Sequence, residues 1–179
     1  MRVLRLTLVS HARTDAMSAG RFPDDEPINS VGRRELQSLL LNPAQRHLVG
    51  PELRTRQTAA ALGLRADTES RLADLNYERW RGSALADISG DDMYAWMTDP
   101  GATPHGGESI LDLIKRVSSW LDSLETDAPA TVAVTHPAVV RAAVLAALDA
   151  APQSFWRIDV APTSATVLHR RGGRWTLRL

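Results

Sequence analysis

The chain has 179 residues, of which 44% are hydrophobic and 23% are charged, and its formal net charge is zero. This composition is ordinary for a folded domain with one hydrophobic core. The balanced charge argues against a dedicated nucleic-acid-binding protein and against a protein that binds anionic membrane surfaces. Because the chain contains no cysteine, disulfides, zinc-thiolate sites and thiol catalysis are excluded.

The N-terminal segment does not match a secretory signal, because Arg2 and Arg5 interrupt a short alternating stretch. No window approaches the roughly 18 consecutive apolar residues that a membrane span needs. We therefore expect a cytoplasmic protein without a membrane-spanning segment. No repeat, linker or low-complexity tract divides the sequence, so we expect a single domain over residues 1–179.

The first half of the chain begins with a β-rich apolar strand over residues 2–9. Residues 15–29 form a long loop rich in glycine, proline and acids, and loops of this length in compact domains are usually functional or mobile. Ser30 is placed to cap a helix that runs to residue 41. A short apolar segment at 47–49 then precedes a second helix over residues 52–62.

The second half contains a short helix over residues 91–97 and a regular amphipathic helix over 109–124. A β-branched strand at 131–135 leads into a helix at 138–148. Three further strands are expected, over residues 155–160, 165–169 and 175–179, with the turn Arg171–Arg174 joining the last two. This alternation predicts an α/β sandwich with a largely parallel sheet and an antiparallel C-terminal hairpin.

Two histidines follow predicted strands at their C-terminal ends: His11 after the first strand, and His136 after the strand at 131–135. In open α/β sheets, ligands bind beyond the carboxyl ends of the strands, at the N-termini of helices. A lone histidine in such a position is more often structural than catalytic. Two in matched settings favour a functional site at this edge of the sheet.

Five short motifs accompany the histidines in sequence order. They are Ser10-His11-Ala12-Arg13-Thr14, Leu53-Arg54-Thr55-Arg56-Gln57-Thr58-Ala59, the segment from Leu72-Ala73-Asp74 to Gly82, Gly107-Glu108-Ser109 with Arg116, and Thr135-His136-Pro137. In order and spacing the chain resembles the histidine phosphatase superfamily, the phosphoglycerate-mutase-like proteins. The corresponding family motifs begin Arg-His-Gly-x-Thr, Leu-x-Arg-Ala-x-Gln-Thr-Ala, Leu-x-Glu, Gly-Glu-Ser and Ser-His-Gly. The resemblance implies a three-layer α/β/α sandwich of the phosphoglycerate-mutase type.

The resemblance also implies a phosphatase that works through a phosphohistidine, without a metal or an organic cofactor. His11 would be the nucleophile, its other ring nitrogen donating to a backbone carbonyl. Arg54 would clamp the phosphoryl oxygens, and His136 would neutralise charge as an imidazolium. Asp74 stands where the family keeps the acid that protonates the leaving oxygen, one methylene shorter than the usual Glu. Glu108 is a second candidate acid, although its place at a helix start is explained by the macrodipole alone.

The sequence departs from the family pattern around the expected pocket. Ser10 replaces an arginine, and a hydrogen bond to a charged group is worth about 1.5–3 kcal/mol. Ala12 replaces a glycine, which would restrict a turn that requires positive φ. Met17 stands where many members have Asn, and Pro137 offers no backbone amide. We expect Ser10 to remain a polar group in the phosphate pocket, and Arg13 or another cation to replace part of the missing arginine.

Two hypotheses follow from these departures. The chain is either an active phosphatase with a modified pocket, or a catalytically weakened or inactive member that binds a phosphate-containing ligand or a partner. The retention of His11, Arg54 and His136 together favours the first. A mutase fits less well, because the chain lacks room for the longer insertions of those enzymes. The expected partner is a small phosphorylated substrate or a phosphohistidine protein, and the acids at 24–26 disfavour inositol polyphosphates.

Overall fold

The computed structural model describes residues 3–125 and 127–179. Within these residues one sheet contains β1 (Leu4–Ser10), β2 (Arg46–Val49), β3 (Asp67–Thr68), β4 (Thr131–Thr135), β5 (Ala165–Arg171) and β6 (Arg174–Arg178). The spatial order of the strands is β3-β2-β4-β1-β5-β6. The first four of these are mutually parallel, and β5 and β6 are antiparallel to their neighbours. The mostly parallel sheet and the antiparallel C-terminal hairpin are therefore confirmed.

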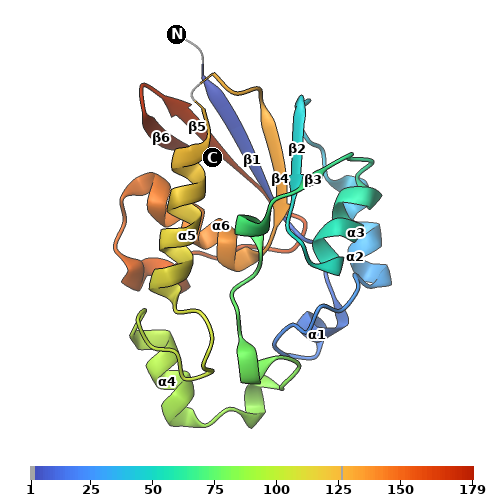
Figure 1. Ribbon diagram of the computed structural model, residues 1–179. Coiled ribbons are helices and arrows are strands. Elements are labelled where there is room, and N and C mark those ends of the chain that lie inside the picture. The colour runs from blue at the N-terminus through green and yellow to red at the C-terminus, as the bar shows by residue number, and fades with distance from the viewer. Residues whose placement is uncertain (1–2, 126) are drawn as a thin grey trace.

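Helices cover both faces of this sheet (Figure 1). On one face lie α5 (Ile110–Ser123) and α6 (Pro137–Leu148), and on the other α2 (Ser30–Glu35) and α3 (Leu53–Ala61). The helices α1 (Asp15–Ser18) and α4 (Gly90–Thr98) lie beyond the end of the sheet at which β1 and β4 finish. Short 3-10 helices are η1 (Leu36–Ser38), η2 (Ser70–Leu72), η3 (Glu78–Trp80), η4 (Leu85–Asp87) and η5 (Pro152–Arg157). The predicted three-layer α/β/α architecture is confirmed.

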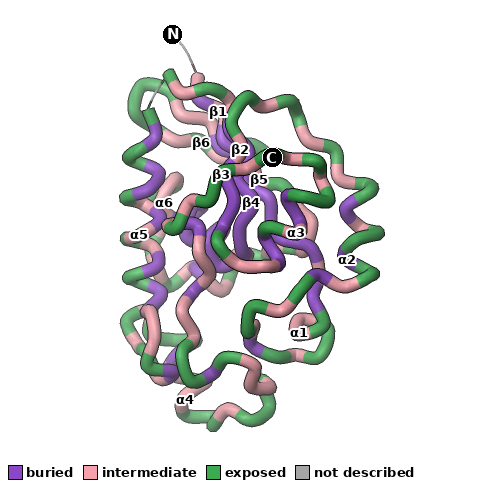
Figure 2. The backbone as a smooth tube through the Cα atoms, turned by 45° about the vertical axis from the view of Figure 1, so that its right-hand side comes forward, coloured by how far each residue is buried: buried purple, intermediate pink, exposed green. Residues whose placement is uncertain are grey.

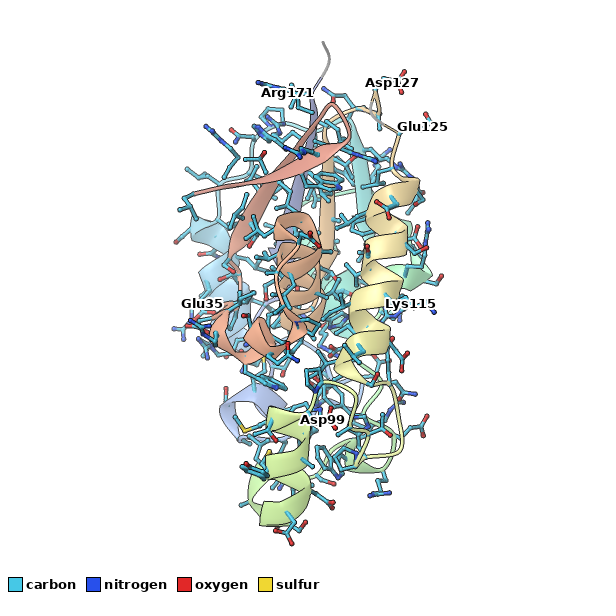
Figure 3. The ribbon with its side chains drawn as sticks, turned by 90° about the vertical axis from the view of Figure 1, so that its left-hand side faces the viewer. Glu35, Asp99, Lys115, Glu125, Asp127 and Arg171 are labelled. Atoms are coloured by element: carbon cyan, nitrogen blue, oxygen red, sulfur yellow. The ribbon has the colours of Figure 1, made fainter. Side chains whose placement is uncertain are left out.

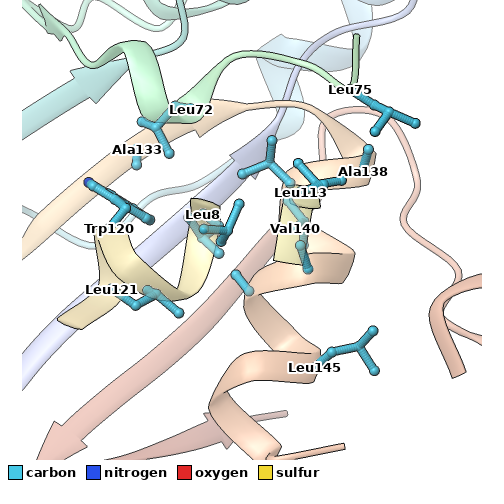
Figure 4. Packing of buried hydrophobic residues seen from close by; sticks show 14 of the residues in the cluster. Leu8, Leu72, Leu75, Leu113, Trp120, Leu121, Ala133, Ala138, Val140 and Leu145 are labelled. Atoms are coloured by element: carbon cyan, nitrogen blue, oxygen red, sulfur yellow. The ribbon is translucent and has the colours of Figure 1, made fainter. Parts of the chain in front are cut away.

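The core lies between the sheet and its two helical layers, and the central strands β1 and β4 are buried along most of their length (Figure 2). Alternate residues of β1 point to opposite faces. Leu8 packs in the cluster formed with α5 and α6, near Leu113 and Val140 (Figure 4), and Val9 belongs to the cluster on the α3 face. Each large apolar side chain that is fully buried contributes about 1.5–3 kcal/mol, so this packing fixes the sheet edge that positions the site.

Two expectations in the C-terminal half and in the first loop were wrong. The strand expected over residues 155–160 is replaced by η5 (Pro152–Arg157), because Pro152 favours a helical turn and Phe155 and Ile158 recur at helical spacing. The loop expected over residues 15–29 contains α1, whose N-cap Thr14 accepts a hydrogen bond from the Met17 amide at 3.3 Å.

Two further differences concern the segment before β2 and the edge of the sheet. The helix expected to run to residue 41 ends at Glu35 and tightens into η1, and Leu39 and Leu41 then pack against the apolar cluster that contains Val49. The strand β3 was not predicted, because two exposed polar residues carry no alternating pattern.

Charged side chains of several elements lie at the periphery of the molecule. The labelled Asp99, Lys115, Glu125, Asp127 and Arg171 are all exposed (Figure 3). In the described part of the chain, no helix combines the length and the apolar character needed to cross a membrane.

Candidate active site

The parallel pairing of β1 with β4 brings the two histidines together. Ser10 is the register partner of Thr135, so the next residue of each strand is a histidine at the same edge of the sheet. The amide of His11 donates to the Thr135 carbonyl oxygen at 2.9 Å, and the ring centroids of His11 and His136 are 5.2 Å apart. The predicted meeting of two strand-end histidines is thus present in the structure.

The His11 ring is held in one tautomer. Its Nδ1 lies 2.8 Å from the Ala12 carbonyl oxygen, and because a carbonyl only accepts, Nδ1 carries the proton and Nε2 keeps its lone pair. Burial, and then the charges of His136 and Arg54, lower the pKa of His11 from 6.5 to about 3. The ring is therefore neutral at physiological pH, which is the state that a nucleophile requires.

Arg54 enters the site from the first turn of α3 and is 2% exposed. One of its terminal nitrogens, Nη2, donates to Asp74 Oδ2 at 2.6 Å. Its Nε and Nη1 are buried and have no hydrogen-bond partner among the described residues. Buried donors are nearly always paired, so two unpaired donors on one guanidinium mark a place for an anionic ligand.

Glu52 was not predicted to be a site residue, yet it binds His136 directly. Its Oε2 lies 2.7 Å from His136 Nε2, and its Oε1 accepts from the Asp74 amide at 2.9 Å. The pKa of Glu52 is lowered: burial opposes the shift, but the hydrogen bond and the charge of His136 outweigh it. The available signal was an acidic N-cap immediately before the helix that contains Arg54.

Asp74 lies between Arg54 and His136. Its Oδ2 is 2.6 Å from Arg54 Nη2 and 3.3 Å from His136 Nδ1, which has no hydrogen-bond partner among the described residues. Burial alone would raise the pKa of Asp74, but the charges of His136 and Arg54 lower it. The carboxylate is therefore ionised.

The segment that presents Asp74 is fixed by Arg116 of α5. The guanidinium donates to both oxygens of Glu108 at 2.8 Å and to the carbonyl oxygens of Arg71, Ala73 and Asp74 at 2.8–3.2 Å. Glu108 is thus paired with Arg116 and does not line the cavity that contains His11. The geometry favours Asp74 over Glu108 as the acid.

A cavity of about 260 Å³ opens beside His11 and is lined also by Arg54 and Asp74. Two of the residues at which the sequence departs from the family pattern, Met17 and Pro137, line it as well. Among the described residues, Arg21 and Arg141 also line it, and neither was predicted to be a site residue. The position of Arg141 on the helix that begins directly after His136 was the available signal. Within residues 3–125 and 127–179, no group of three metal-ligating side chains could hold a metal ion.

The structure does not bring two expected phosphate ligands into this cavity. Arg13 pairs with Glu35 at 3.4 Å instead. Ser10 is fully buried within β1, and its Oγ has no partner among the described residues. The expected strain at Ala12 is also absent, because this residue does not have a positive φ. Glu78, in the segment that follows Asp74, is a non-glycine residue with a positive φ, at +39°.

Comparisons with known proteins identify the family of the chain. The family model described as histidine phosphatase superfamily (branch 1) matches residues 6–179. A glucosyl-3-phosphoglycerate phosphatase from Mycobacterium tuberculosis (strain ATCC 25618 / H37Rv) is 30% identical over 180 residues, which cover 87% of this chain and 80% of that protein.

Two solved structures share the fold. One is a mycobacterial glucosyl-3-phosphoglycerate phosphatase in complex with VO3, with a TM-score of 0.87 and 24% identity over 100% of this chain and 98% of the other. The second is a phosphoserine phosphatase mutant from Entamoeba histolytica in complex with phosphoserine, with a TM-score of 0.86 and 18% identity over 97% and 94% of the two chains. The chain described here belongs to the histidine phosphatase superfamily.

Proposed function

We propose that the chain is a phosphatase that hydrolyses a small phosphomonoester through a phosphohistidine on His11. One observation supports this most directly. A neutral His11, whose Nδ1 is committed to a backbone carbonyl, lies beside buried nitrogens of Arg54 and His136 that have no partner among the described residues. A phosphoryl group in the cavity would satisfy those donors while its phosphorus faces the remaining nitrogen of His11.

In the first step Nε2 of His11 attacks phosphorus, and the bond from phosphorus to the leaving oxygen breaks. Arg54 and the His136 imidazolium stabilise the charge on the transferring group. Asp74 supplies the proton to the leaving oxygen. In the second step water attacks the phosphohistidine, Asp74 takes up a proton from that water, and phosphate leaves with His11 again neutral.

An ionised Asp74 can still serve as the acid once substrate binds. The pKa of Asp74 is low because Arg54 and His136 face it. A phosphate group would engage both cations and add negative charge nearby, and both effects raise the pKa of a carboxyl group. Protonation of Asp74 is therefore coupled to substrate binding.

The substrate class is a small phosphomonoester of an alcohol. The relatives named above act, by their names, on glucosyl-3-phosphoglycerate and phosphoserine, which are small phosphorylated molecules. A cavity of about 260 Å³ suits such a ligand better than a protein phosphohistidine, whose polypeptide would have to approach the buried His11.

Hydrolysis of 4-nitrophenyl phosphate between pH 5 and pH 8, compared with the His11→Ala variant, tests the proposal. We expect turnover by the wild type, and a phosphorus-32 label on His11 after brief exposure to labelled substrate. Turnover no higher than that of His11→Ala would refute the enzyme hypothesis. The second hypothesis, a weakened member that only binds ligands, is supported by the acids Glu52 and Asp74 that face the two cations, and predicts vanadate binding without turnover.

A further inference from the structure

The part of the cavity formed by α6 contains a guanidinium with a fixed orientation. Arg141 lines the same cavity as His11, Arg54 and Asp74. Its Nε donates to the Ile158 carbonyl oxygen at 2.8 Å. Its Cζ lies 5.7 Å from the Phe155 ring centroid and 5.6 Å from that of Trp156. The backbone bond and the two aromatic rings hold the planar group in place without using its terminal nitrogens.

This half-buried cation has no carboxylate partner among residues 3–125 and 127–179. Arg13, Arg54, Arg71 and Arg116 each form an ion pair within 4 Å, whereas Arg141 forms none in the described part of the chain. Neither Nη atom of Arg141 has a hydrogen-bond partner there, since its one bond is through Nε. Burial lowers the pKa of Arg141, and the more distant charges of Asp159 and Asp74 oppose this shift only in part, so its surroundings do not compensate fully for lost hydration. A bound anion would do so.

We propose that Arg141 binds a carboxylate on the leaving group of the substrate, so that this phosphatase prefers phosphomonoesters of hydroxy acids. The inference rests on the proposed function, because it places the carboxylate beside the phosphoryl group attacked by His11. The two free Nη atoms of a guanidinium match the two oxygens of a carboxylate in a bidentate pair.

A carboxylate fits this region better than a second phosphate. Glu26 lines the same cavity and lies close enough to Arg54 to help raise its pKa. The other cation of the cavity, Arg21, is exposed and donates to the Gly82 carbonyl oxygen at 3.1 Å. With Asp74 paired to Arg54, Arg141 is the cation held in place among the described residues of this cavity that remains for a second anionic group. The single positive charge of Arg141 is balanced by the single negative charge of a carboxylate. A second phosphate, which carries two negative charges, would leave one of them without a partner.

A matched pair of substrates isolates the carboxylate. 3-Phosphoglycerate and glycerol 3-phosphate are both three-carbon phosphomonoesters, and they differ by a carboxylate in place of a hydroxymethyl group. We expect the wild type to prefer 3-phosphoglycerate in kcat/KM. Arg141→Met should reduce that preference about ten- to a hundredfold, the range expected when one hydrogen-bonded charge pair is lost. Arg141→Lys should restore part of it, because the charge remains but the planar fork does not.

Arg170 offers a matched control, because it also donates to backbone carbonyls and lies 5.6 Å from a tryptophan ring, Trp175, but does not line the cavity. Arg170→Met should keep the wild-type preference, and thermal melting of each variant checks that it folds. The inference is overturned if the wild type shows no preference for the carboxylate or if Arg141→Met retains it.

A binding measurement separates this inference from the proposed function. Calorimetric titration of His11→Ala with the two compounds measures affinity without turnover. If His11→Ala binds 3-phosphoglycerate more tightly than glycerol 3-phosphate, and the double variant His11→Ala/Arg141→Met does not, the subsite is supported even if the chain hydrolyses nothing. Equal affinities for the two compounds refute the subsite even if 4-nitrophenyl phosphate is hydrolysed.

Discussion

The Glu52→Gln substitution tests how the site keeps His136 in position. The carboxylate of Glu52 lies 2.7 Å from His136 Nε2, so this nitrogen donates to it and the other nitrogen, Nδ1, is left for the phosphoryl group. Glutamine has nearly the same shape and its amide oxygen can still accept from His136 Nε2 or from the Asp74 amide. The substitution therefore removes a charge while preserving most of the geometry.

The magnitude follows from the kind of bond that is exchanged. A hydrogen bond to a charged group contributes about 1.5–3 kcal/mol and a neutral one about 0.5–1.5 kcal/mol. Glu52→Gln should therefore cost about 1–2 kcal/mol in stabilisation of the His136 imidazolium, which lowers kcat about 5- to 30-fold. The loss of a negative charge beside the phosphate site acts in the opposite direction on anion binding. We expect KM for the substrate to stay constant or to fall.

Steady-state kinetics with 4-nitrophenyl phosphate measure both constants. Glu69→Gln is a matched control, because Glu69 is a partly buried carboxylate paired with Arg71 that does not line the cavity of His11. A rise in KM at unchanged kcat in Glu52→Gln would show that Glu52 contacts substrate and does not act through His136. If Glu52→Gln and Glu69→Gln lower kcat equally, the effect arises from reduced stability of the fold and not from the bond to His136.

Three further predictions concern the stability of the fold. Between pH 6.5 and about pH 3 the unfolded chain binds a proton at His11 that the folded chain excludes, so the free energy of unfolding falls as the pH drops. In urea unfolding, the wild type should lose about 2 kcal/mol more than His11→Gln between pH 7 and pH 5. Arg116→Met leaves Glu108 unpaired and frees three carbonyl groups, and should destabilise the chain by about 2–4 kcal/mol in the same assay; an unchanged midpoint would contradict the anchoring role of Arg116. Glu78→Gly relieves a side chain held at a φ of +39° and should raise the thermal midpoint, corresponding to about 1 kcal/mol; a lower midpoint would mean that its hydrogen bond with Asn76 outweighs the strain.

The sheet and its histidine pair could be predicted because they depend on patterns local to each strand. An apolar strand that ends in a histidine is readable at His11 and again at His136, and parallel pairing of the two strands is enough to bring them together. The same holds for α5, whose apolar residues recur at helical spacing along its whole length. The order of the predicted strands and helices along the chain was then enough to predict the α/β sandwich.

The side chains around the histidines could not be predicted in the same way, because their roles depend on contacts across the tertiary structure. Glu52 and His136 are far apart in the sequence, and no local pattern in either segment predicts the contact between them. Arg13 and Arg141 illustrate the reverse problem. Sequence proximity to His11 favoured Arg13, but its side chain reaches Glu35, whereas Arg141 on α6 lines the cavity.

The charges around the phosphoryl site explain why specificity should reside in the leaving group. With His136 protonated, its charge and that of Arg54 are matched by the carboxylates of Glu52 and Asp74, which lie within 2.7 Å of them. Ser10, the residue before His11, adds no charge. Free phosphate therefore gains little net attraction from this pocket and should bind weakly as a product. Binding energy for the intact substrate must then come from the rest of the molecule, and the fixed guanidinium in that part of the cavity belongs to Arg141.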